Sequence, residues 1–175
     1  MSDLLSQVEP MIPALRRYAH GLLRNPETAD DIVQDCLEKV VSNWSRRRDE
    51  NARSWVFTIL HNLAINRIRQ GARRSGMVPL DDMPEGTASI AAGQEDMLFG
   101  QDVLAAIERL PPDHRSILLL VTVEDLSYAE AATILSIPVG TVMSRLARAR
   151  EQLRTILESK PVGTSTSGPY IRRVK

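Results

Sequence analysis

The chain has 175 residues, of which 43% are hydrophobic and 25% charged, and its formal net charge is zero. This length fits one domain or two small ones. The most apolar stretch, residues 117–121, is far too short to span a bilayer. One cysteine, Cys36, excludes an internal disulfide, and the three scattered histidines show no zinc-ligand spacing. Phosphate-binding, dinucleotide-binding and nucleophile-elbow motifs are also missing, so we expect no enzyme active site, no cofactor and no metal.

The zero net charge hides a segregation of charge along the chain. Residues 45–74 contain eight Lys or Arg against two acidic residues, whereas residues 76–107 contain six Asp or Glu and no basic residue. Because Pro and Gly interrupt the acidic stretch and it has no helical periodicity, we expect a flexible linker there. A Gly-, Ser- and Thr-rich tail, which could be disordered, would end the chain. The predicted fold is all-α, with two small helical domains at residues 8–75 and 101–158. The linker between them covers residues 76–100, and the tail covers residues 159–175.

Apolar residues at helical spacing predict three helices in the N-terminal domain. The first covers about Val8–Leu23, the second begins with Asn25 as N-cap and Pro26 as first helical residue, and the third covers about Arg53–Arg69. The second helix has a polar, acidic outer face, which by itself is typical of a solvated surface: Asp31, Gln34, Asp35 and Glu38. The third has amide and guanidinium groups that suit nucleic acid or merely aid solubility: Asn62, Asn66, Arg67 and Arg69.

The C-terminal domain contains a predicted pair of short helices with a tight turn between them. Ser127 and Glu130 form a capping box at the start of the first helix, and Pro138 ends it because the residue before a proline disfavours the α region. The second helix covers about Pro138–Leu157. Its apolar stripe is formed by Val139, Val142, Leu146, Ala149, Leu153 and Ile156. Polar residues that could reach DNA in the major groove lie opposite or beside the stripe: Thr141, Ser144, Arg145, Arg148 and Arg150.

Four segments together resemble the extracytoplasmic-function (ECF) group of alternative sigma factors in the bacterial sigma-70 family. They are NPETADDIVQD at 25–35, RSWVFTILHNLAIN at 53–66, LPPDHR at 110–115 and the helix pair at 125–150. They occur in family order and with family spacing over about residues 8–158. The resemblance implies a sigma-2-like and a sigma-4-like helix-turn-helix domain that direct promoter-specific transcription initiation without catalysis. It implies a cytoplasmic protein, as does the lack of a signal peptide.

The resemblance also implies a role for each surface. The acidic face at Asp31, Gln34, Asp35 and Glu38 would bind the β′ coiled coil of core RNA polymerase, with the β subunit as a further contact. The −10 element would be read by the third helix and the loop before it: Arg47, Arg48, Asn51, Asn62, Asn66, Arg67 and Arg69. The −35 element would be read by Thr141, Ser144, Arg145, Arg148 and Arg150. An anti-sigma factor is a further implied partner.

Two other functions stay open on the sequence. A stand-alone helix-turn-helix regulator would leave the acidic face and the basic third helix unexplained. A decoy that imitates a sigma factor to occupy an anti-sigma protein has no need to retain Arg145, Arg148 and Arg150. Many family members have an arginine where this chain has Met143, and some have an aromatic residue where it has Ala147. The −35 sequence therefore cannot be transferred from better-known members.

Overall fold

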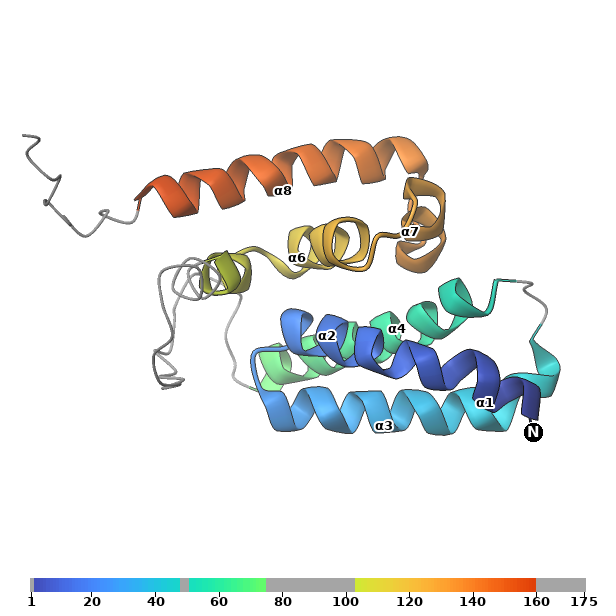
Figure 1. Cartoon of the computed structure of the whole chain (residues 1–175). Coiled ribbons are helices and arrows are strands. Elements are labelled where there is room, and N and C mark those ends of the chain that lie inside the picture. Colours follow the sequence, from blue (N-terminus) through green and yellow to red (C-terminus); the bar gives the residue numbers. More distant parts are fainter. Residues whose placement is uncertain (1, 48–50, 75–102, 160–175) are drawn as a thin grey trace, which may run out of the picture.

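The computed structural model describes residues 2–47, 51–74 and 103–159, and every regular element within them is helical (Figure 1). We call residues 2–74 the N-terminal half and residues 103–159 the C-terminal half. The N-terminal half contains α1 (Ser2–Val8), α2 (Ile12–Leu22), α3 (Pro26–Asn43) and α4 (Ala52–Arg74), with 3-10 turns at Glu9–Met11 and Trp44–Arg46. The C-terminal half contains a helical stretch over residues 103–108, α6 (Pro112–Leu118), a π-helical turn at Leu119–Val123, α7 (Tyr128–Leu135) and α8 (Val139–Ser159). The predicted linker, the tail from residue 160 and Arg48 lie outside the described residues.

The helices of the N-terminal half begin where the sequence predicts, with one addition and one extension. The Asn25 side chain accepts a hydrogen bond from the Thr28 N–H at 2.9 Å, and Pro26 occupies the first turn of α3. The first predicted helix is preceded by α1, whose Leu4 and Val8 are buried. The third predicted helix continues to Arg74 as α4, because no proline or capping residue interrupts it earlier.

The helices are stacked so that α3 and α8 lie on opposite outer sides (Figure 1). Next to α3 come α2 and α4, and next to α8 come α6 and α7. The two inner layers meet, with α2 packed on α6 and α4 packed on α7. Buried side chains of both halves form one hydrophobic cluster, which includes Leu15, Leu22, Leu60, Ile117, Leu120 and Leu146. The two predicted helical units are therefore closed against each other.

Arg115, from the LPPDHR segment, joins the two halves through carbonyl groups. Its guanidinium donates to the carbonyl oxygens of Leu22 at 2.7 Å, Glu108 at 2.7 Å and Leu110 at 2.8 Å. Leu22 is the last residue of α2, so Arg115 satisfies a carbonyl that the helix itself leaves without a partner. Burial is the main cause that lowers the pKa of Arg115 to about 10, with a further contribution from Arg24. The side chain therefore stays charged at neutral pH.

A polar pair lies inside the core of the N-terminal half. The Tyr18 hydroxyl is 2.8 Å from His61 Nδ1, and the Tyr18 ring packs edge-on against Phe57 with centroids 5.7 Å apart. Burial raises the pKa of the Tyr18 hydroxyl, so it keeps its proton and pairs with His61 as a neutral group. Burial lowers the pKa of His61 to about 4, against a weaker opposing effect of Asp113. The imidazole is therefore neutral at physiological pH.

Candidate nucleic-acid interface

The first helix of the C-terminal pair begins with the predicted capping box. The Ser127 hydroxyl accepts from the Glu130 N–H at 3.2 Å, and the Glu130 carboxylate accepts from the Ser127 N–H at 2.9 Å. This hydrogen bond to the Ser127 backbone is the main cause that lowers the pKa of Glu130. The capping box therefore fixes the point at which the chain enters α7.

The turn between α7 and α8 depends on a residue with a left-handed backbone. Ser136 has φ 53° and ψ 45°, and the next residue, Ile137, donates its N–H to the carbonyl of Ala132 at 3.1 Å. This is a Schellman ending, in which glycine is the usual residue at the left-handed position. The Pro138 carbonyl then accepts from the N–H groups of Thr141 and Val142 and starts α8. The turn is predictable from Pro138, but the left-handed conformation of Ser136 is not.

The two faces of α8 differ in burial as the stripe predicts, with one correction. Val142, Leu146 and Ala149 are buried in contact with α6 and α7, and Leu153 and Ile156 are partly buried. The stripe includes Val139, but this residue is 44% exposed: it is the first residue of α8 and lines an open surface hollow with Ala132 and Thr133 of α7. Of the polar set, Ser144, Arg148 and Arg150 are exposed and Thr141 is half-buried.

Arg145 is the member of the −35 set that makes an ion pair. Its Nη1 lies 3.4 Å from Asp113 Oδ2 at the start of α6, and its side chain is 34% exposed. This contact holds the guanidinium at the shoulder of α8 rather than on the outermost line of the helix. Arg148, one turn further on, makes no side-chain hydrogen bond or ion pair within the described part of the chain. The two arginines therefore differ in how far their side chains are restrained.

Four of the residues predicted to read the −10 element belong to α4. Val56, Phe57, Leu60 and Ala64 are buried, which turns the opposite face to solvent. Asn62, Asn66 and Arg69 lie on that opposite face and are exposed. Arg67 follows Leu60 and Ala64 on the same side of the helix, but it is exposed as well. The four side chains are therefore close along the helix but do not all share one face.

The other residues predicted to read the −10 element belong to the loop before α4. Arg47 places its guanidinium carbon 4.1 Å from the centre of the Trp44 ring, and Trp44 packs edge-on against Trp55 with centroids 6.1 Å apart. Asn51 accepts from the Ser54 N–H at 3.1 Å and so caps α4, while its amide donates to Glu130 at 2.9 Å. The structure thus places Asn51 between the start of α4 and the start of α7. Its contact with the C-terminal half joins residues 79 apart, which local sequence patterns cannot show.

The acidic face predicted on the second helix is formed by α3. Asp31, Gln34, Asp35 and Glu38 are all exposed, and Gln34 donates to Glu38 at 3.3 Å. The opposite side of α3 is buried through Ala29, Ile32, Val33, Cys36 and Val40. Because the buried side of α3 packs on α2 and α4, the acidic face lies on the opposite side of the helix.

Across residues 2–47, 51–74 and 103–159, no group of three His, Cys, Asp or Glu side chains is arranged to hold a metal ion. None of the helices described here has the length and apolar content needed to cross a membrane.

Comparison with known proteins identifies the family. The description "Sigma-70, region 4" matches residues 100–153, and "Sigma2 domain of PhyR" matches residues 8–61. The ECF RNA polymerase sigma factor EcfG of Rhodopseudomonas palustris is 37% identical over 156 residues, which cover 89% of this chain and 85% of the relative. The chain belongs to the ECF group of the sigma-70 family. It is an alternative sigma factor that directs transcription, and the resemblance seen in the sequence is confirmed.

Solved structures agree with this family and with the all-α fold. The sigma factor RpoE of Bartonella quintana, in complex with the anti-sigma factor NepR, superposes with a TM-score of 0.73 at 28% identity. The superposition covers 92% of this chain and 100% of that chain. The anti-anti-sigma factor PhyR of the same organism, also in complex with NepR, has a TM-score of 0.56 at 19% identity and is covered over 49% of its length. The PhyR likeness shows the fold alone.

Proposed function

We propose that this ECF sigma factor binds core RNA polymerase through the acidic face of α3 and reads promoter DNA at two places. The −10 element is read by α4 and the residues before it, and the −35 element by α8. The chain supplies no catalytic chemistry of its own. The observation that carries this proposal is that one chain exposes three chemically distinct surfaces on three separate helices: acidic on α3, amide and guanidinium on α4, and hydroxyl and guanidinium on α8.

For the −35 element, exposure separates base contacts from phosphate contacts. Ser144 and Arg148 project from the solvent side of α8 and are placed to reach base edges, with Thr141 beside them. Arginine bonds guanine through two donors at once, and a hydroxyl bonds either bases or phosphates. Arg145, held by Asp113, and Arg150 on the flank are placed to bind phosphates. This division matches a helix that enters the major groove by its N-terminal turns.

For the −10 element, the proposed readers lie in the middle and second half of α4 and in the loop before it. Amide and guanidinium side chains at Asn62, Asn66, Arg67 and Arg69 suit the backbone and the unstacked bases of a single strand. Arg47 and Asn51 belong to the loop before α4, and Arg47 lies over the ring of Trp44 in the Trp44–Trp55 pair. Arg48 is included from the sequence, since it lies outside the described residues. Aromatic rings beside cationic groups are favourable surroundings for an extruded base.

Polymerase binding is assigned to α3 because charge is concentrated on its outer side. Asp31, Gln34, Asp35 and Glu38 offer carboxylate and amide oxygens to a basic helical partner, which we take to be the β′ coiled coil. The β subunit is the further polymerase contact we propose. By analogy with the RpoE–NepR complex, an anti-sigma factor is a further proposed partner, which would compete with polymerase. The cytoplasm is the proposed compartment in which these partners meet.

The docking assignment is tested by reversing two charges at once. An exposed ion pair contributes only about 0–1 kcal/mol, so the double variant Asp31→Lys/Asp35→Lys is needed for a clear effect. We expect weaker binding to fluorescently labelled core polymerase and unchanged binding of the full chain to duplex DNA. The matched control is Glu9→Lys/Glu158→Lys, which reverses two exposed acids elsewhere and leaves polymerase affinity unchanged. Normal polymerase affinity in the first double variant would remove α3 from the docking site.

A decoy function is the second candidate, favoured by the match of residues 8–61 to the sigma-2 domain of PhyR. A decoy would bind an anti-sigma factor but neither polymerase nor promoter DNA. The exposed arginines on α8 and the identity of 37% to EcfG over most of both chains favour the sigma factor. Failure of the wild-type chain to bind core polymerase, with retained binding to an anti-sigma factor, would establish the decoy instead.

A further inference from the structure

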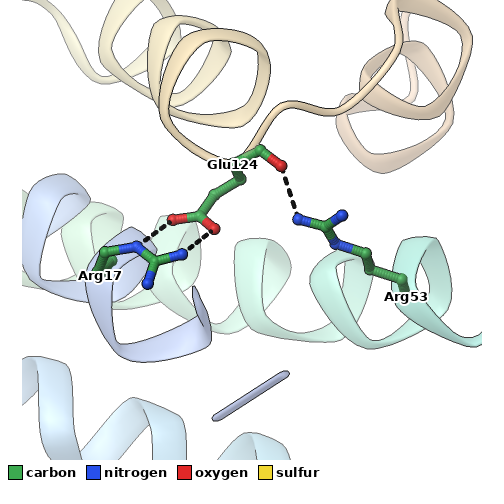
Figure 2. A network of polar contacts seen from close by, with 3 residues as sticks. All are labelled: Arg17, Arg53 and Glu124. Carbon is green, nitrogen blue, oxygen red and sulfur yellow. Dashed lines mark hydrogen bonds and ion pairs between the residues drawn. The ribbon is translucent and has the colours of Figure 1, made fainter. Parts of the chain in front are cut away.

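The two halves meet at an arginine–glutamate pair that is buried on one side only. Arg17 of α2 binds Glu124 through two hydrogen bonds, Nε to Oε1 at 3.2 Å and Nη2 to Oε2 at 2.9 Å (Figure 2). The Glu124 side chain is 0% exposed, whereas that of Arg17 is 56% exposed. These residues are 107 positions apart in the chain and belong to opposite halves. The contact therefore exists only while the halves are closed.

A second arginine holds the same residue from the other side. Arg53, in the first turn of α4, donates from Nη2 to the Glu124 carbonyl oxygen at 2.6 Å (Figure 2). The residue after Glu124, Asp125, has a left-handed backbone with φ 53°, which turns the chain sharply before α7. Aspartate tolerates this conformation better than most residues. The turn thus directs the Glu124 side chain to Arg17 and its carbonyl to Arg53.

Further contacts close the halves along the rest of their interface. The Asn51 amide donates to the Glu130 carboxylate, so the cap of α4 is bonded to the capping box of α7. At the other end, Arg24 donates to the Glu108 carbonyl at 3.0 Å. Between these two contacts, α2 approaches the π-helical turn so closely that a Cβ atom added to Gly21 would lie 2.9 Å from both terminal carbons of Leu119. Contacts at both ends and a tight approach between them favour one defined closed arrangement.

This closed arrangement does not fit simultaneous reading of two promoter elements. By their names, the −10 and −35 elements are about 25 base pairs apart, or roughly 85 Å of duplex at about 3.4 Å per base pair. Packed helices such as α4 and α7 have axes only about 8–10 Å apart. Closure also engages Asn51, a proposed −10 reader, with Glu130. Promoter reading therefore requires that the two halves separate.

We propose that the Arg17–Glu124–Arg53 contacts are a latch that holds the free chain in a closed, self-inhibited state, which core polymerase must open. The inhibitory part of this inference rests on the proposed function, whereas the closure itself does not. The latch is held by the chain's own residues and needs no second protein. Arg17 is the side chain most easily withdrawn, because more than half of it already faces solvent.

The asymmetry of the pair predicts which substitution opens the chain most. Removing Arg17 leaves the Glu124 carboxylate buried without its charge partner, a state much less favourable than the same carboxylate in water. Opening hydrates the carboxylate, so Arg17→Ala favours the open form by about tenfold in the ratio of open to closed chains. The double variant Arg17→Ala/Glu124→Gln replaces the unpaired carboxylate by a neutral amide. Opening then no longer gains the hydration of a buried charge, so part of the population returns to the closed form. A merely weakened interface would not show this reversal.

The latch is tested by measuring the separation of the halves in the full chain. Nitroxide labels are attached at Lys39→Cys on α3 and Thr155→Cys on α8, both exposed, in a Cys36→Ala background. Electron spin resonance distances are then recorded for this reference, for Arg17→Ala, for the double variant and for Arg16→Ala. Arg16 is an exposed neighbour without a side-chain partner in the described residues and is the matched control. Circular dichroism verifies that each variant is folded.

We expect one short distance in the reference and in Arg16→Ala, an added long component in Arg17→Ala, and partial loss of that component in the double variant. The apparent affinity for core polymerase should rise with the open fraction, by up to about tenfold. A folded Arg17→Ala chain with reference distances would overturn the latch, as would a reference chain that is already open. Opening without any gain in polymerase affinity would overturn self-inhibition. Failure of every variant to bind polymerase would refute the proposed function instead, and the distances would still decide whether the latch exists.

Discussion

Replacement of Arg115 by alanine should be one of the most destabilising single changes in this chain. The buried guanidinium donates to three carbonyl oxygens, those of Leu22, Glu108 and Leu110. Hydrogen bonds to a charged group contribute about 1.5–3 kcal/mol each, and part of this is offset because the buried charge no longer has to be desolvated. We therefore expect Arg115→Ala to lower the free energy of unfolding by about 3–5 kcal/mol. Total stabilities are only about 5–15 kcal/mol, so such a loss is severe.

Urea unfolding followed by circular dichroism measures this loss as a lower midpoint at an unchanged slope. Arg115→Lys keeps the charge but lacks the planar fork, and we expect it to lose about half as much. Arg109→Ala is the control: Arg109 lies at the same corner, is exposed, and should change stability by no more than about 0.5 kcal/mol. A loss below about 1 kcal/mol for Arg115→Ala would refute the view that this arginine joins the halves.

Two further predictions concern DNA reading and pH. Arg148→Ala should weaken binding of the preferred −35 sequence by about 1–3 kcal/mol and reduce discrimination between bases there. Arg145→Ala, which removes the partner of Asp113, should weaken binding to all sequences evenly and reduce the salt dependence of binding. Both effects are measured by a base-substitution scan of holoenzyme binding, and the reverse result would exchange the roles of the two arginines. His61 has a pKa of about 4 when folded and about 6.5 when unfolded, so between those pH values the unfolded chain binds a proton that the folded chain does not. The free energy of unfolding should fall by about 3 kcal/mol as the pH drops from about 6.5 to 4. In His61→Gln the fall over the same pH range should be smaller. Equal pH profiles for the two proteins would contradict the burial of a neutral imidazole beside Tyr18.

The elements whose signals are local could be predicted from the sequence. Asn25 and Pro26 start α3, and Ser127 and Glu130 start α7, because a cap depends on residues within one turn of each other. Helical periodicity likewise separated the buried and exposed sides of α3 and of most of α8. These predictions needed no knowledge of what packs against each helix.

The contacts between the halves could not be predicted in this way. Arg17 and Glu124 are 107 residues apart, and each by itself looks like an ordinary surface charge. The ion pair that restrains Arg145 depends on the start of α6, 32 residues earlier in the chain. Val139 fits the apolar period of α8 but is 44% exposed at the rim of an open hollow beside α7. In each case tertiary packing, rather than local pattern, decides the environment of the side chain.

Transcription reconstituted from core RNA polymerase and the full chain is the decisive measurement of the proposed function. With a library of promoter fragments as template, we expect transcripts from a defined subset only when both components are present. We also expect Asp31→Lys/Asp35→Lys to lower the yield from all of these promoters, and Arg148→Ala to change which promoters are used. Tight, site-specific binding of duplex DNA by the chain alone, with no promoter-specific transcript in the presence of polymerase, would contradict the proposed function.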